Sequence, residues 1–160
     1  MAMAFLATTR DASAVERKGF IAGIGIGGGK ITCSDCESKS GTAVALHLGG
    51  MLTEKVALVL GLSVVSTDDN DLTSSVASAA VQYFVSPKVW VKGGIASVLL
   101  EVNGKGSYAS NTGGGFQGGL GVEVVQKKRF AIDLQVRFTT AKIEGERTNN
   151  VMALLGFNLY

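Results

Sequence analysis

The strongest constraint on the fold of this chain is that its apolar residues recur at every second position along most of its length. Successive side chains of a β-strand point to opposite sides, so a period of two is typical of a strand with two unlike faces. We find eight such segments and no convincing helix: 19–27, 43–48, 56–64, 72–85, 89–99, 116–124, 130–139 and 151–160. The sequence therefore predicts an all-β chain.

The connections between these segments alternate in length. Tight turns are predicted at 52–55, 86–88 and 126–129, and longer polar loops at 33–41, 67–71, 103–111 and 144–150. This alternation is typical of an antiparallel up-and-down meander that closes into an eight-stranded β-barrel, with the short turns at one end. We expect one barrel domain over residues 18–160. Residues 1–17 are interpreted as the remnant of a signal peptide or as a disordered tail.

Two kinds of barrel share this pattern, and they differ in which face is apolar. A soluble, lipocalin-like barrel binds a ligand inside an apolar cavity, whereas a membrane barrel turns its apolar face to lipid. Here the second face is mainly Gly, Ala, Ser, Thr and Gln, and charged residues make up 18% of the chain. The outer face of a soluble barrel needs more charge than this. The composition favours a transmembrane barrel, and the lipocalin-like barrel is the alternative.

Aromatic residues near the predicted short turns support the membrane interpretation. Membrane barrels carry girdles of aromatic side chains at the lipid–water interface. The candidates for such a girdle are Phe20, Tyr83, Phe84, Trp90, Phe130 and Tyr160.

Three stretches carry a resemblance to a known family: "VQYFVSPKVWVKGGIA" (81–96), "GGFQGGLGVEVVQKKRFAIDLQVRFTTA" (114–141) and "VMALLGFNLY" (151–160). In these stretches the chain resembles the outer-membrane β-barrel proteins of Gram-negative bacteria, in the eight-stranded class similar to the transmembrane domain of outer-membrane protein A. The resemblance implies a location in the bacterial outer membrane and a monomer embedded in the lipid bilayer. It also implies that the barrel-assembly machinery recognises the C-terminal strand. Tyr160 fits the terminal aromatic of this family, but the other phase of the strand is more apolar, so its facing stays open.

Several charged and polar residues fall on or near the less apolar phase of their strands. If that phase faces inward, they meet in a narrow lumen, where charges need partners. We expect a polar network that plugs and stiffens the barrel, with a small-solute pore as the alternative. The candidates are His47, Gln82, Lys92, Glu123, Asp133 and Arg137. The turn at 86–88 also predicts that Gln82 lies opposite Lys92.

A Cys-x-x-Cys pair, Cys33 and Cys36, lies in the first long loop. In an oxidising compartment we expect it to form a small disulfide. Neither a metal site nor a redox pair is expected, because further ligands and a helix N-terminus are missing from the pattern.

The sequence contains no strong catalytic or cofactor motif. Gly23, Gly25 and Gly28 have the spacing of a dinucleotide fingerprint, but no helix is predicted after them. We interpret Gly19, Gly23, Gly25 and Gly27, which share one face of the first strand, as an inward row that leaves room for larger side chains. The basic run 127–129 is too short for a nucleic-acid surface. We therefore expect no enzyme activity, no cofactor and no nucleic-acid partner.

Overall fold

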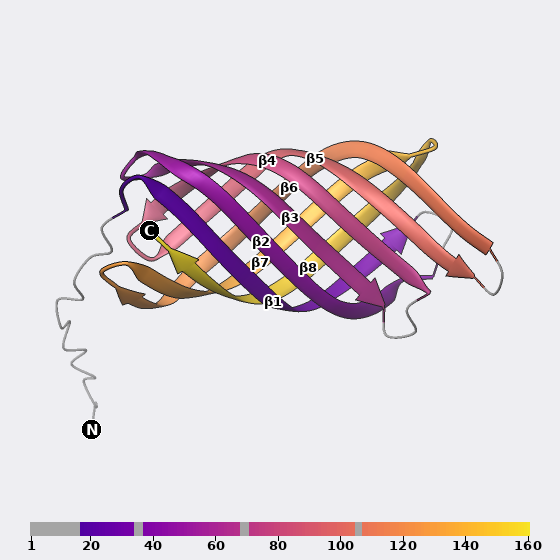
Figure 1. Ribbon diagram of the computed structural model, residues 1–160, viewed down its shortest axis with the longest axis horizontal. Helices are drawn as coiled ribbons and strands as arrows, with labels where there is room; N and C mark the ends of the chain where they lie inside the picture. The colour runs from indigo at the N-terminus through magenta and orange to yellow at the C-terminus, as the bar shows by residue number, and fades with distance from the viewer. Residues whose placement is uncertain (1–16, 34–36, 68–70, 105–106) are drawn as a thin grey trace, which may run out of the picture.

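The structure, a computed structural model, describes residues 17–33, 37–67, 71–104 and 107–160, which form one closed antiparallel barrel (Figure 1). Its strands are β1 (Phe20–Cys33), β2 (Lys39–Thr53), β3 (Val56–Thr67), β4 (Leu72–Ser86), β5 (Val89–Gly104), β6 (Ser107–Lys127), β7 (Phe130–Ile143) and β8 (Glu146–Leu159). Each strand pairs with the next in the chain, and β8 closes the barrel by pairing with β1 from Ala22↔Leu159 to Cys33↔Thr148. The predicted fold class is confirmed.

The tight turns are stabilised by hydroxyl side chains. The Thr53 hydroxyl accepts hydrogen bonds from the backbone amides of Lys55 and Val56, at 3.2 and 3.1 Å. Ser86 accepts equivalent bonds in the β4–β5 turn, including one from Val89 at 3.1 Å. These side-chain acceptors satisfy amides that have no ladder partner, which fixes the strand register at this end.

The other end differs from the prediction. The strands β7 and β8 are joined by Glu144 and Gly145 alone, with φ of 52° and 95°, so the expected loop over 144–150 is wrong. Two residues with positive φ make a hairpin turn whose twist matches the strands. The polar residues that follow the turn pair with β7, from Ile143↔Glu146 to Thr139↔Asn150. Polar composition alone therefore did not distinguish a loop from the polar end of a strand.

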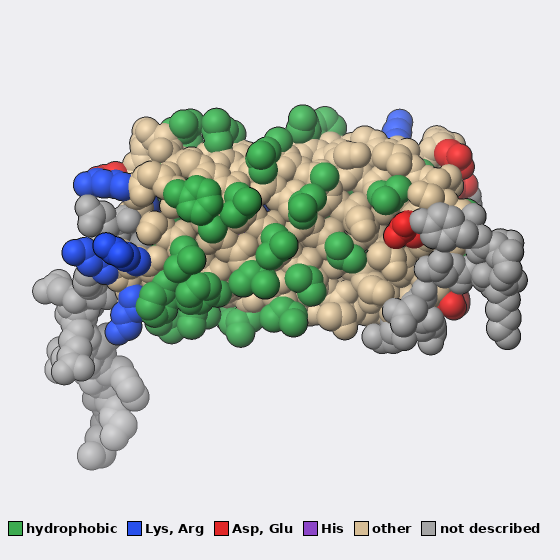
Figure 2. Space-filling view, in the orientation of Figure 1, with side chains coloured by type: hydrophobic (Ala, Val, Ile, Leu, Met, Phe, Trp, Pro, Cys, Tyr) green, Lys and Arg blue, Asp and Glu red, His purple; other side chains and the backbone are tan. Residues whose placement is uncertain are grey.

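The large apolar side chains face outward. Leu60, Ile95 and Phe116 are 68%, 64% and 67% exposed, respectively. In Figure 2 such side chains cover the visible wall from the short-turn end past the middle, and the wall nearer the other end is mostly polar. On β8 the exposed residues include Leu155 and Leu159, which shows that the phase opposite to Tyr160 faces outward.

The interior has two unlike halves. Toward the loop end it holds two clusters of buried apolar side chains: one of Ile31, Ala43, Ala45, Val65, Leu72, Met152 and Leu154, and one of Val76, Ala96, Val98, Ala141 and Ile143. The interior is therefore not small and polar throughout. On β3 both faces are apolar where Val64 points outward and Val65 inward, so a period of two cannot reveal an apolar lumen there.

Candidate functional site

The short-turn half of the interior holds a cluster of buried polar side chains. The structure places all the predicted lumen residues here, each less than 9% exposed: His47, Gln82, Lys92, Glu123, Asp133 and Arg137. Gln82 pairs with Lys92 across β4 and β5, as predicted from the turn. These side chains belong to strands that are far apart in the sequence, and the closed barrel brings them into one space.

Asp133 anchors one series of contacts that crosses this space. Its carboxylate accepts hydrogen bonds from the Trp90 indole Nε1, at 2.8 Å, and from the Gln135 amide, at 2.6 Å. The Gln135 oxygen accepts a bond from Arg137 Nε at 2.9 Å, and Arg137 lies 3.4 Å from His47 Nδ1. The series runs from β5 through β7 to β2, which are not neighbouring strands, so it spans the lumen.

Glycines make room for these large side chains. Trp90 pairs with Gly121 on β6, and a Cβ atom at Gly121 would lie 2.2 Å from the indole ring. His47 pairs with Gly23 on β1, where a Cβ would lie 2.3 Å from the imidazole. Gly23, which belongs to the inward glycine row predicted from the sequence, therefore has a packing role, because the His47 side chain opposite it occupies the volume that a Cβ would need.

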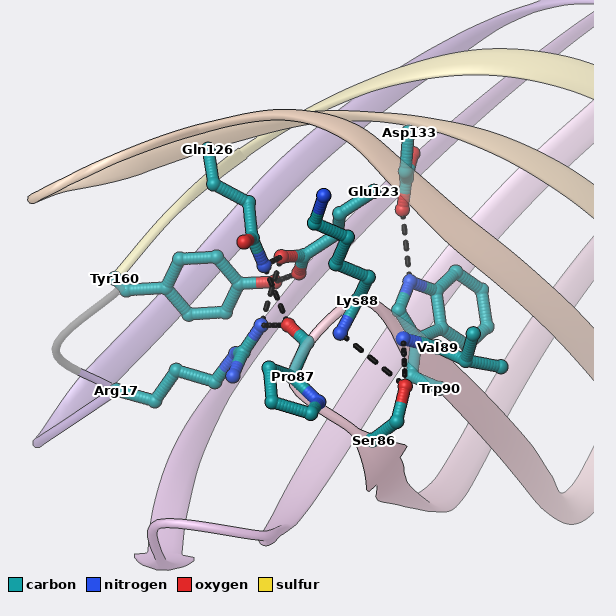
Figure 3. A network of polar contacts seen from close by, with 10 residues as sticks. All are labelled: Arg17, Ser86, Pro87, Lys88, Val89, Trp90, Glu123, Gln126, Asp133 and Tyr160. Carbon is teal, nitrogen blue, oxygen red and sulfur yellow. Dashed lines mark hydrogen bonds and ion pairs between the residues drawn. The ribbon is translucent and has the colours of Figure 1, made fainter. Parts of the chain in front are cut away.

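Glu123 is the centre of a second network, at the short-turn mouth of the barrel (Figure 3). Its carboxylate is 2.7 Å from the Arg17 guanidinium and accepts hydrogen bonds from the Gln126 amide, at 2.6 Å, and the Tyr160 hydroxyl, at 2.5 Å. Arg17 also donates to the Pro87 carbonyl at 2.7 Å, and Gln126 donates to the same oxygen. We call these five residues the clasp.

The clasp ties together parts of the barrel that the strand ladder does not join. It links the segment before β1, the β4–β5 turn, the bulge in β6 and the residue after β8. The Arg17 guanidinium also lies over the rings of Phe84, at 4.0 Å, and Tyr160, at 5.3 Å. Burial and the neighbouring Glu123 carboxylate raise the pKa of Tyr160, so its hydroxyl stays protonated and remains a donor.

Sequence reasoning missed Arg17, which falls within the stretch interpreted as a tail. Arg17 is 8% exposed, while residues 1–16 lie outside the described part of the chain. No periodic pattern includes Arg17, since it precedes the first strand. Its partner Glu123 was predicted to face the lumen, and a buried carboxylate needs a cation or several donors, which was the available signal.

The predicted aromatic girdle requires correction. Phe20 and Tyr83 are 60% and 44% exposed on the outer face, and Phe130 stacks on Phe157 with ring centroids 5.5 Å apart. In contrast, Phe84 and Trp90 are buried in the barrel, and Tyr160 turns into its mouth to contact Phe84 and Glu123. Adjacent residues such as Tyr83 and Phe84 cannot both face lipid, because strand side chains alternate. Nearness to a turn was the wrong criterion, and strand phase is the right one.

The loop end of the barrel has a charged mouth. Among the described residues, no group of three or more His, Cys, Asp or Glu side chains is placed to hold a metal ion. A hollow of about 450 Å³ lies in this mouth, and its charged lining residues are Glu37, Lys39, Asp71, Glu144 and Glu146. Cys36 lies outside the described residues, so its predicted disulfide with Cys33 stays a prediction.

A closed barrel with large apolar side chains outside and buried polar groups inside defines a transmembrane β-barrel. Within the described residues, no helix is long and apolar enough to cross a bilayer. Residues 1–159 match the family model of the outer membrane protein beta-barrel domain, and the chain belongs to this family. It is therefore a bacterial outer-membrane protein, embedded in the lipid of that membrane.

Solved structures agree with this assignment at the level of the fold. Neisserial surface protein A is 16% identical, with a TM-score of 0.74 over 89% of this chain and 97% of that one. The N-terminal barrel of Pseudomonas aeruginosa OprF is 15% identical, with a TM-score of 0.60 over 88% and 98%. Ail, the attachment invasion locus protein of Yersinia pestis, is 13% identical, with a TM-score of 0.57 over 88% and 99%. No curated protein matches the chain.

Proposed function

We propose that the chain is a structural, membrane-anchoring barrel whose lumen does not conduct and which carries no catalytic activity. The observation that carries this proposal is the series of contacts from Trp90 through Asp133 to His47, which crosses the lumen. The two apolar clusters of the loop half form a second barrier, because an ion entering an apolar interior loses its hydration without gaining partners.

Planar-bilayer recording tests this proposal. We expect reconstituted wild-type protein to show no reproducible conductance steps in potassium chloride, while a folded band that shifts on boiling shows that it has inserted. Reproducible steps would favour the alternative, a small-solute pore. If such steps changed size in R137A but not in the outward-facing variant V136A, the pore would run through the polar half of the lumen.

We propose further that the short turns and both barrel termini face the periplasm, which leaves the other end as a small external surface. In this orientation β8 is the C-terminal strand offered to the barrel-assembly machinery, and its outward residues include Val151, Leu155, Phe157 and Leu159. We expect a monomer, which light scattering in detergent would check. Residues 1–17 would include the remnant of the export signal.

The external mouth is small and mainly acidic. The structure of Ail has been solved with the heparin analogue sucrose octasulfate. Four carboxylates lie around the mouth of this chain: Glu37, Asp71, Glu144 and Glu146. Their negative charge disfavours the binding of a polysulfated ligand there.

We propose that a Cys33–Cys36 disulfide closes the first external loop. A mass increase of two hydrogen atoms in the peptide 31–39 on reduction would test it.

A further inference from the structure

The two ends of the barrel differ in charge. Exposed basic side chains surround the short-turn end, and we call this set the basic rim: Lys18, Lys55, Lys88, Lys127, Lys128 and Arg129. The only exposed carboxylate at this end among the described residues is Glu54. The loop end instead mixes acids with bases, and Lys39 there pairs with Asp71 at 3.7 Å. Figure 2 shows most of the blue side chains at the short-turn end, with a little red beside them, and most of the red ones at the other end, where some blue is also visible.

Most cations of the rim have no carboxylate partner in the described chain. Arg17 pairs with Glu123 and Lys39 with Asp71, whereas no described carboxylate pairs with Lys55, Lys88 or the run 127–129. Three neighbouring cations in one turn repel one another unless an anion lies nearby. These exposed cations are therefore available to an anion from outside the described part of the chain.

The rim lies where lipid headgroups lie. Lys55, Lys88 and Arg129 directly precede the first residues of β3, β5 and β7. The residue after Arg129 is Phe130, which stacks with Phe157 on the outer wall, and the exposed Phe20 begins β1 two residues after Lys18. Since aromatic girdles mark the lipid–water interface, the rim cations extend from the edge of the apolar wall into the headgroup layer.

We propose that the basic rim binds the phosphate groups of anionic phospholipids in the periplasmic leaflet of the outer membrane. This inference rests on the proposed orientation of the barrel. The long, flexible lysine and arginine stems allow the rim to follow mobile headgroups, and phosphate oxygens provide acceptors for Lys55, Lys88 and the run 127–129. A wholly solvated rim would show no preference between lipids that differ only in headgroup charge.

The test compares two variants that each remove three positive charges. The rim variant is K127Q/K128Q/R129Q, and the control from the loop end is K30Q/K39Q/K142Q. Each is folded into phosphatidylcholine vesicles with a small amount of spin-labelled phosphatidylglycerol or spin-labelled phosphatidylcholine. The motionally restricted fraction of each label gives the preference for the anionic lipid. We expect the wild type and the control to prefer phosphatidylglycerol. In the rim variant we expect the preference for phosphatidylglycerol to fall by about fivefold for each cation removed from a headgroup. High salt should also weaken this preference.

The outcomes separate this inference from the function on which it rests. Two results would overturn the inference if the heat-modifiable band shows that the protein has folded. One is an equal preference of the wild type for the two lipids, and the other is an equal loss of the preference for phosphatidylglycerol in both variants. Absence of that band in every vesicle would instead contradict the membrane barrel. Retention of the wild type on isolated cell-wall sacculi, without a lipid preference, would also overturn the inference and indicate a cell-wall polymer as the partner.

Discussion

Replacing Arg17 with methionine tests whether the clasp stabilises the barrel. Methionine keeps much of the apolar contact with Phe84 and Tyr160 but removes the charge. Glu123, only 1% exposed, then keeps two donors, from Tyr160 and Gln126, and loses its cation. Removing one partner of a buried ion pair costs about 3 to 5 kcal/mol. Because two donors remain, we expect R17M to lower the free energy of unfolding by about 3 kcal/mol.

A double-mutant cycle isolates the interaction. E123Q removes the buried charge, so R17M/E123Q leaves no isolated carboxylate and should cost less than R17M alone. Urea unfolding of the vesicle-reconstituted protein, followed by the fluorescence of Trp90, measures each value. The control is K55M, which removes an exposed charge from the same end of the barrel and should change stability by no more than about 0.5 kcal/mol. The clasp has no stabilising role if R17M lies within about 0.5 kcal/mol of the wild type.

Two further predictions concern packing and pH. G121V should lower the free energy of unfolding by about 1 to 3 kcal/mol or prevent folding, because its Cβ would lie 2.2 Å from the Trp90 ring. The control is G114V, which has no atom within 4 Å of its Cβ and should fold normally, as measured by the shift of the folded band on boiling. The raised pKa of folded Tyr160 stabilises the barrel below the unfolded tyrosine pKa of about 10 and ceases to do so as the pH rises above it. Wild-type stability should therefore fall more steeply than that of Y160F from pH 10 upward, and parallel urea titrations would contradict this.

Much of the fold was predicted from the alternation of apolar residues, because a period of two indicates both where the strands lie and which side chains share a face. The polar lumen candidates were identified for the same reason: Asp133 and Arg137 lie on the less apolar phase of the segment 130–139. Gly23 was interpreted as lumen-facing packing space, and the structure shows that its partner is His47. Local pattern was sufficient for these features.

Three features depend on long-range contacts that a local pattern does not contain. Arg17 meets Glu123 across 106 positions of the chain, and no spacing rule connects them. Trp90 lies inside because Asp133 and Gly121 give it a partner and a space, neither of which is near it in the sequence. The apolar half of the lumen brings together Ile31, Val65 and Met152 from β1, β3 and β8, which lie far apart in the sequence.

The most direct test of the inside-out arrangement uses the single tryptophan of the chain. In vesicles of acyl-brominated lipid, Trp90 should not be quenched, because it is 1% exposed and faces the lumen. The variant W90F/L60W moves the fluorophore to a side chain that is 68% exposed on the outer wall, and it should be strongly quenched. Strong quenching of Trp90 together with weak quenching at position 60 would contradict a barrel with its apolar face in lipid and its polar groups inside.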